Sequence, residues 1–106
     1  MLSKFHNSQA KGTEDLLRRI AVEKRKLSNA WVKIQMEIGR CRARKRKHEF
    51  ALGKLGSSPE KAHLRNDLES AIDRSNRALD KLRGQIGGIN NLMEELTLFE
   101  ALAEEG

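Results

Sequence analysis

The sequence predicts an all-α protein in which two long helices pair as an antiparallel coiled-coil hairpin. Apolar residues recur at heptad spacing through both halves of the chain, the pattern of helices that share a packed seam. One strong break, Leu55-Gly56-Ser57-Ser58-Pro59, divides the chain near its middle. The composition favours helices, because Leu, Ala, Glu, Lys and Arg dominate while Pro occurs once and Tyr is absent.

The N-terminal residues 1–12 are polar, end at Gly12 and show no apolar periodicity, so we expect a flexible tail. Thr13 suits a helix N-cap, and Glu14 and Asp15 would then place carboxylates at the positive end of the helix dipole. The first helix is therefore expected at about 13–55. Its seam is the series Leu17, Ile20, Lys24, Leu27, Trp31, Ile34, Ile38, Cys41, Lys45, His48, Leu52 and Leu55.

The break contains the residues that end one helix and start another. Gly56 suits the left-handed conformation at a helix end, Ser58 suits an N-cap, and Pro59 suits the first helical position. Ser57 with Glu60 forms an alternative capping box. A second helix is expected at about 58–105, and residues 13–106 are expected to form a single helical-hairpin domain. Its seam is the series Leu68, Ile72, Ser75, Leu79, Leu82, Ile86, Ile89, Met93, Leu96 and Ala103.

Folding the chain at this turn predicts a register in which paired residue numbers sum to about 113. Leu17 then meets Leu96, and Ile34 meets Leu79. The same register predicts six charge pairs, which together would favour one orientation although each contributes only a few tenths of a kcal/mol. The pairs are Arg18–Glu95, Arg19–Glu94, Lys33–Asp80, Arg40–Asp73, Arg44–Glu69 and Arg46–Asp67.

The second helix carries more apolar residues near its C-terminal end than a two-helix seam requires. One interpretation is scattered surface hydrophobes, which are normal. The interpretation that the sequence favours is a protein interface, formed in a homodimeric four-helix bundle or with another chain. The candidate interface residues are Leu92, Met93, Leu96, Leu98, Phe99 and Leu102.

Three glycines, Gly84, Gly87 and Gly88, interrupt the second helix. Each costs up to about 1 kcal/mol relative to Ala in a helix interior. They predict a bend, a hinge or a close approach of another helix. The preferred interpretation is that they make room for the indole of Trp31 or for a partner's helix.

Charge is distributed unevenly along the chain. Residues 1–54 carry 15 Lys and Arg against 5 Asp and Glu, and residues 55–106 carry 6 against 10. The most basic stretch is Arg40–His48. It has three interpretations: a solvated face partly neutralised by the second helix, a site for nucleic-acid phosphates, or a dock for an acidic protein surface. The candidate residues are Arg40, Arg42, Arg44, Lys45, Arg46 and Lys47.

Two further observations bear on the basic stretch. Single-strand binders usually place aromatic side chains along a basic groove, and here Tyr is absent and Trp31 belongs to the seam. A duplex or a structured RNA contacted through phosphates remains open. The run Arg42–Lys47 also matches a nuclear-localisation cluster, a weak signal because such runs are common.

Catalysis, cofactors and metals find no support in the sequence. His6, His48 and His63 have no metal-ligand spacing, and Cys41 falls at a seam position, where a cysteine is usually a small core residue. No glycine-rich phosphate loop is present. No apolar run approaches the roughly 20 residues of a membrane span, and no signal peptide begins the chain. We therefore expect no enzyme, no small-molecule substrate and no membrane partner.

The sequence predicts a non-enzymatic helical interaction protein: an adaptor, a chaperone-like subunit or an assembly factor. It would bind a larger protein through the apolar C-terminal patch and the basic hairpin tip, or associate with a second copy. The alternative is a nucleic-acid-binding protein that contacts phosphates through Arg40–His48. One cysteine fits a reducing compartment, so the expected location is intracellular and cytoplasmic, or nuclear in a eukaryote.

Overall fold

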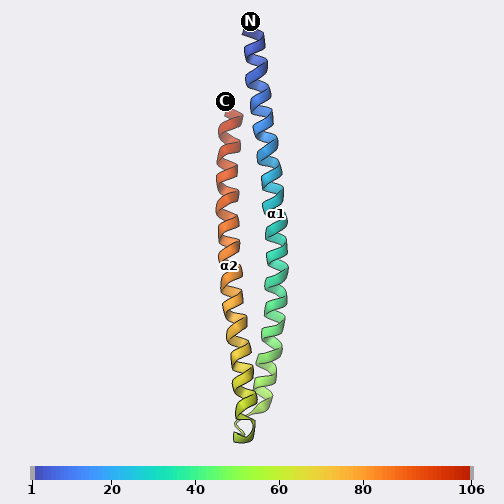
Figure 1. Cartoon of the computed structure of the whole chain (residues 1–106), viewed down its shortest axis with the longest axis vertical. Helices are drawn as coiled ribbons and strands as arrows, with labels where there is room; N and C mark the ends of the chain where they lie inside the picture. Colours follow the sequence, from blue (N-terminus) through green and yellow to red (C-terminus); the bar gives the residue numbers. More distant parts are fainter. Residues whose placement is uncertain (1, 106) are drawn as a thin grey trace. The chain divides into compact units, whose positions relative to one another are not determined.

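The computed structural model consists of two long helices joined by a short turn (Figure 1). It describes the backbone of residues 2–105 and the side chains of residues 12–105. Helix α1 spans Leu2–Leu55, the 3-10 turn η1 spans Pro59–Lys61, and α2 spans Ala62–Glu105. Residues 2–105 contain no strand. The predicted all-α hairpin is therefore confirmed.

Helix α1 begins earlier than the sequence indicated. Gly12 and Thr13 both lie within it, so Thr13 does not cap the helix. A single glycine costs about 1 kcal/mol in a helix and does not by itself end one. The predicted tail, residues 1–12, falls outside the described side chains apart from Gly12, and it stays a prediction.

The turn has the geometry that its residues favour. Gly56 has φ +64°, the left-handed conformation predicted for it, and Pro59 occupies the start of η1. Ser58 precedes it in an extended conformation, but its side chain makes no capping hydrogen bond. The amide of Lys61 donates to the carbonyl of Ser58 over 3.2 Å and closes the 3-10 turn. Helix α2 therefore begins at Ala62, four residues later than predicted.

Arg65 stabilises this turn from the first part of α2. Its Nη2 atom donates to the carbonyl oxygens of Gly56, at 2.8 Å, and Ser58, at 3.1 Å. Backbone carbonyls just beyond a helix end have no partner within the helix, so the guanidinium supplies one to Gly56 and adds a second to Ser58, which already accepts from the Lys61 amide.

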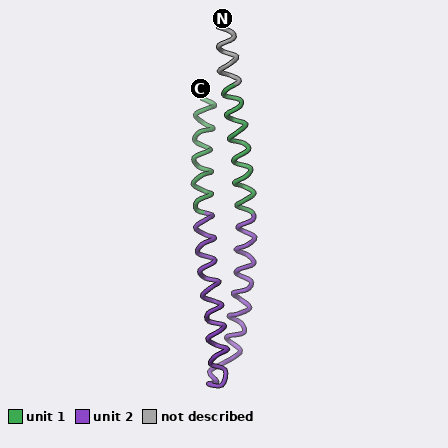
Figure 2. Tube along the Cα trace, in the orientation of Figure 1, with its two compact units in different colours: residues 1–32, 87–106 green, residues 33–86 purple. Residues whose placement is uncertain are grey.

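Contacts divide the chain into two compact units (Figure 2). Unit 1 comprises residues 1–32 and 87–106, and unit 2 comprises residues 33–86. Unit 2 contains the turn and a core of Ile38, Cys41 and Leu79. Within each unit a segment of α1 packs antiparallel on a segment of α2.

Burial follows the predicted heptad seam closely. All predicted seam residues of both helices are buried or half-buried except Trp31, which is 39% exposed. Arg65 and Glu100 are half-buried at seam positions that the sequence analysis did not include. The indole is too large for a layer between only two helices, which explains why Trp31 projects from the seam.

The register differs from the predicted one. Ile20 and Leu96 line one groove, and the Cys41 Sγ atom donates to the carbonyl of Ser75, so these pairs sum to 116 rather than 113. The 3-10 turn explains the shift, because it moves the fold-back point towards the C-terminus. In the described part of the chain, none of the six predicted inter-helix charge pairs forms an ion pair.

The glycines of α2 lie in open surroundings. A Cβ atom added at Gly84, Gly87 or Gly88 would have no heavy atom of another part of the chain within 4 Å. The interpretation that they make room for the Trp31 indole is therefore wrong. Within the described chain their cost to the helix is not offset by packing.

We predict that Gly84→Ala stabilises the protein. Alanine fits the helical conformation, meets no neighbour, and removes backbone freedom from the unfolded chain. The free energy of unfolding should rise by about 0.5–1 kcal/mol, measured by urea denaturation followed by circular dichroism. An unchanged or lower midpoint would contradict the open helical surroundings of this position.

Candidate interaction grooves

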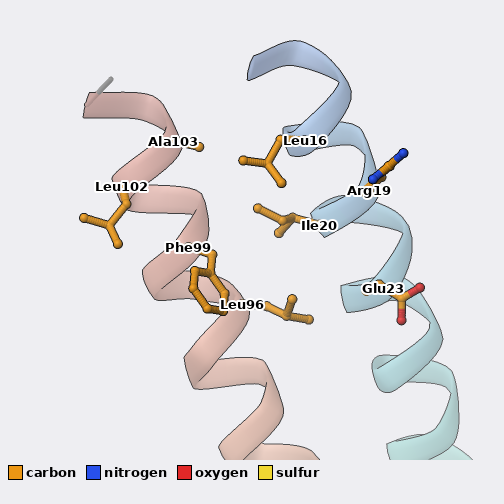
Figure 3. A pocket seen from close by; sticks show the side chains of 8 residues that line it. All are labelled: Leu16, Arg19, Ile20, Glu23, Leu96, Phe99, Leu102 and Ala103. Atoms are coloured by element: carbon orange, nitrogen blue, oxygen red, sulfur yellow. The ribbon is translucent and has the colours of Figure 1, made fainter. Parts of the chain in front are cut away.

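An apolar groove of about 460 Å³ lies between α1 and α2 in unit 1 (Figure 3). Its lining residues are Leu16, Arg19, Ile20, Glu23, Leu96, Phe99, Leu102 and Ala103. Ile20 and Leu96 come from the seam and form the floor, while Arg19 and Glu23 lie on the α1 edge. The groove therefore combines an apolar floor with a polar rim.

Three large apolar side chains of this groove remain exposed: Leu16 at 46%, Phe99 at 57% and Leu102 at 64%. Helical periodicity explains their position. Leu16 and Phe99 are each three or four residues from a seam position and project beside the seam rather than into it. About half of the surface of each of these side chains therefore remains uncovered by the rest of the described chain.

The seam of unit 1 also contains an ion pair between the helices. Lys24 Nζ lies 3.2 Å from Glu100 Oε2, and the two side chains are 23% and 34% exposed. Both residues occupy seam positions, where helical side chains lean towards the N-terminus of their own helix and thus towards each other in an antiparallel pair. Among the described ion pairs it alone joins α1 to α2.

The structure brings together only part of the predicted apolar interface. Leu96, Phe99 and Leu102 line the groove, but Leu92 and Leu98 are exposed outside its lining. Met93 lines a separate groove of about 220 Å³ with Leu27, Ser28, Trp31, Ile89 and Asn90. Leu16 was not among the predicted interface residues, although its place next to the seam residue Leu17 was a usable signal.

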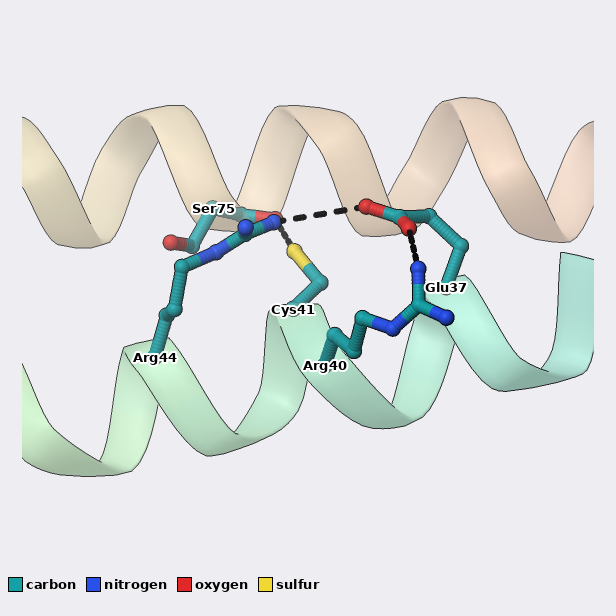
Figure 4. A network of polar contacts seen from close by, with 5 residues as sticks. All are labelled: Glu37, Arg40, Cys41, Arg44 and Ser75. Carbon is teal, nitrogen blue, oxygen red and sulfur yellow. Dashed lines mark hydrogen bonds and ion pairs between the residues drawn. The ribbon is translucent and has the colours of Figure 1, made fainter.

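The predicted basic residues all belong to unit 2. Glu37 pairs with two of them: its carboxylate lies 3.1 Å from Arg40 Nη1 and 3.5 Å from Arg44 Nη2 (Figure 4). Lys45 is half-buried at its seam position. In the described chain Asp67, Glu69 and Asp73 form no ion pair, so the expected neutralisation of the basic stretch does not take this form. Arg42, Arg46 and Lys47 form no ion pair there either.

A second groove, of about 310 Å³, lies between the helices of unit 2 and contains several cationic or polar side chains. Its lining residues are Cys41, Arg44, His48, Ala71, Arg74, Ser75 and Ala78. Arg44 and Arg74 come from different helices, and Ala71 and Ala78 flank Arg74 along α2. The Nδ1 atom of His48 is buried and has no hydrogen-bond partner among the described residues. Arg74 was not among the predicted site residues, because it lies far from the basic stretch in sequence.

Cys41 is a core residue. Its side chain is 2% exposed and packs with Ile38 and Leu79. Its Sγ atom donates to the carbonyl of Ser75 at 3.4 Å (Figure 4). The predicted role of Cys41 as a small seam residue is consistent with this burial.

Together these features define a two-helix coiled coil with one apolar and one basic groove. Among the described residues, no group of three His, Cys, Asp or Glu side chains has the arrangement of a metal site. No helix in this part of the chain is long and apolar enough to cross a membrane. Comparisons with family models, curated proteins and solved structures find no match.

The burial of Cys41 generates a testable prediction. Alkylation of the thiol by iodoacetamide requires unit 2 to open, so the native protein should react at least about tenfold more slowly than the urea-unfolded protein. Mass spectrometry after timed quenching measures both rates, with glutathione correcting for the effect of urea on the reagent. Equal rates after that correction would show that the thiol is accessible.

Proposed function

We propose that this chain is a non-enzymatic helical interaction protein that uses the apolar groove of unit 1 to bind another helical chain. The observation that supports this most directly is the exposure of Leu16, Phe99 and Leu102 around a single groove. Fully burying one such side chain contributes about 1.5–3 kcal/mol. A partner that covers all three gains enough to offset part of the entropy cost of association.

The partner that we propose is a second copy of the chain, in a four-helix arrangement. In a twofold pair whose axis is parallel to the helices, α1 of each copy packs antiparallel on α2 of the other. Leu16 then faces Phe99 of the second copy at the same level. Arg19 lines the groove on α1, and Glu95 is adjacent to the lining residue Leu96 on α2, so this arrangement brings the two opposite charges of different copies towards each other. Opposite charges at both rims favour this pairing.

Phe99→Asp should break this association. The substitution removes the largest apolar side chain of the groove and places a carboxylate there twice per dimer. We expect the dimer dissociation constant to rise by about 100-fold or more, since two buried aromatic side chains are lost. Light scattering coupled to size-exclusion chromatography over a concentration series measures the native mass.

Leu98→Asp provides a matched control. Leu98 is 65% exposed and adjacent in sequence, but it does not line the groove, so its substitution should leave the native mass unchanged. Circular dichroism should show the same helix content in both variants. A monomeric wild-type chain at high concentration, or equal loss in both variants, would reject the second copy as the occupant of the groove.

A second candidate function is nucleic-acid binding by unit 2. The observation that favours it is charge: residues 33–86 carry 14 Lys and Arg against 7 Asp and Glu, a net charge of +7, whereas unit 1 carries 7 against 8. Arg and Lys side chains on helices commonly contact phosphates. Within this proposal the predicted basic residues contact the backbone and confer no base preference.

Affinity for a duplex should then depend steeply on salt. Each phosphate neutralised adds about 0.9 to the negative slope of log affinity against log salt concentration. We expect a slope of about −3 to −6 for a generic 20-base-pair duplex, measured by fluorescence anisotropy between low and physiological salt. A shallow slope with weak binding at low salt would leave the basic residues as a solvated surface.

A further inference from the structure

The cations of unit 2 are concentrated on one side of the seam. On α1, Lys33, Glu37, Arg40, Arg44 and Lys47 alternate at intervals of four and three residues, so they form one stripe along the helix. The ion pairs of Glu37 confirm that these residues share one face of the helix, because its carboxylate contacts both Arg40 and Arg44. Arg44 lines the groove of unit 2, so this stripe borders the groove.

A matching stripe on α2 borders the same groove. Asp67, Ala71, Arg74, Ala78 and Lys81 follow the same intervals, and three of them, Ala71, Arg74 and Ala78, line the groove opposite Arg44. Between residues 33–51 and 67–85, this side of the seam therefore carries six cations against two carboxylates.

The other side of the seam is different. Arg42 is about 200° around α1 from Arg44, and Arg83 is about 180° around α2 from Arg74. Over the same two ranges this side carries three cations against four carboxylates. These residues are Arg42, Arg46 and Glu49 on α1, and Glu69, Asp73, Asp80 and Arg83 on α2. A basic stretch that is continuous in sequence is thus divided between a basic side and a nearly neutral side.

We infer that the basic side of unit 2 is a phosphodiester site, in which one backbone strand of a double-stranded nucleic acid lies along the groove between Arg44 and Arg74. This inference rests on the second candidate function and specifies its site. The inferred contact surface is not the basic stretch but a set of residues from both helices: Arg40, Arg44, Lys47, Arg74 and Lys81.

The dimensions of the groove suit a backbone strand. Arg40 and Lys47 are separated by about 10.5 Å along α1, as are Arg74 and Lys81 along α2. Successive phosphates of one strand advance by about 3.4 Å along the duplex axis and are further apart along the strand itself, so each stripe faces at most about three phosphates. Ala71 and Ala78, on either side of Arg74 along α2, are short and leave the strand room to approach the groove. Arginine is suited to such a site because its planar fork binds two phosphate oxygens.

The lining of the groove also favours a duplex over a single strand. Single-strand sites stack bases on aromatic side chains, and no aromatic residue other than the imidazole of His48 lines this groove. Phe50, the exposed phenyl ring of unit 2, is outside the lining and lies under Lys54, whose Nζ is 4.6 Å from the ring centroid. The groove therefore offers cationic side chains to phosphates but no aromatic surface on which bases could stack.

The test compares two triple variants that remove equal charge. The groove variant is Arg44→Gln, Arg74→Gln and Lys81→Gln, and the control is Arg42→Gln, Arg46→Gln and Arg83→Gln. Each removes one arginine that is ion-paired in the free protein, Arg44 with Glu37 or Arg83 with Asp80. The control removes two residues of the basic stretch, and the groove variant removes only one. If the basic stretch itself were the binding site, the control would therefore weaken duplex binding more than the groove variant does.

We expect the groove variant to bind a 20-base-pair duplex at least about tenfold more weakly than the wild type, with a salt slope reduced by about 2–3. The control should change affinity by less than about threefold. If the wild type binds the duplex but the control loses as much as the groove variant, the inferred site is wrong while nucleic-acid binding stands. If the wild type does not bind, both fail. A single-stranded probe of equal length that binds more tightly than the duplex would also overturn the duplex assignment.

A pair of single variants covers the case in which a triple variant unfolds. Glu37→Gln releases Arg40 and Arg44 on the basic side and should tighten duplex binding by roughly two- to fivefold. Glu49→Gln makes the same charge change on the other side and should have a smaller effect. Equal tightening by both would mean that only net charge matters, which contradicts a sided site.

Discussion

The seam between α1 and α2 is the constraint on which the rest of the structure depends. With only two helices, each residue layer buries little, and among the described side chains only Ile20, Ile38, Cys41, Leu79 and Ile89 are apolar and fully buried. Some polar residues of the seam have a partner within the pair, as Lys24 has Glu100 and Arg65 has the turn carbonyls, whereas the buried Nδ1 atom of His48 has none among the described residues. Most of the remaining described side chains are exposed, so the candidate sites of this chain are surface grooves.

Much of the fold was predictable because heptad spacing and helix-ending residues act locally. All seam residues except Arg65 and Glu100, as well as Gly56 and Pro59, were identified from the sequence. The register was not, for a physical reason: after a shift of the pairing sum from 113 to 116, about half a heptad, one of the two heptad series of each helix again lies opposite a seam series, as Ile20 lies opposite Leu96 and Cys41 opposite Ser75. The apolar pattern therefore distinguishes such registers only weakly. Exposed charge pairs are too weak to do so, and the length of the 3-10 turn decides it.

The candidate sites were predictable as stretches but not as surfaces. Arg42 and Arg44 are two residues apart in sequence and lie on opposite sides of the seam, whereas Arg44 and Arg74 are far apart and border one groove. The same holds for Leu16 and Phe99 in unit 1. A linear motif identifies which residues are charged or apolar. Which of them share a groove depends on the register, so an error of half a heptad was enough to hide Arg74 and Leu16.

The glycines of α2 affect how readily the middle of this helix opens locally. Since no side chain packs against Gly84, Gly87 or Gly88, residues 84–88 are held by helical hydrogen bonds and, through side-chain packing, by Ile86 alone. Water can compete for those bonds more readily here than beside Leu79, where the seam must separate first. A helix that is geometrically continuous from Ala62 to Glu105 therefore has an interior segment that opens at low energetic cost. Its amide protons would exchange with solvent as those of a helix end do.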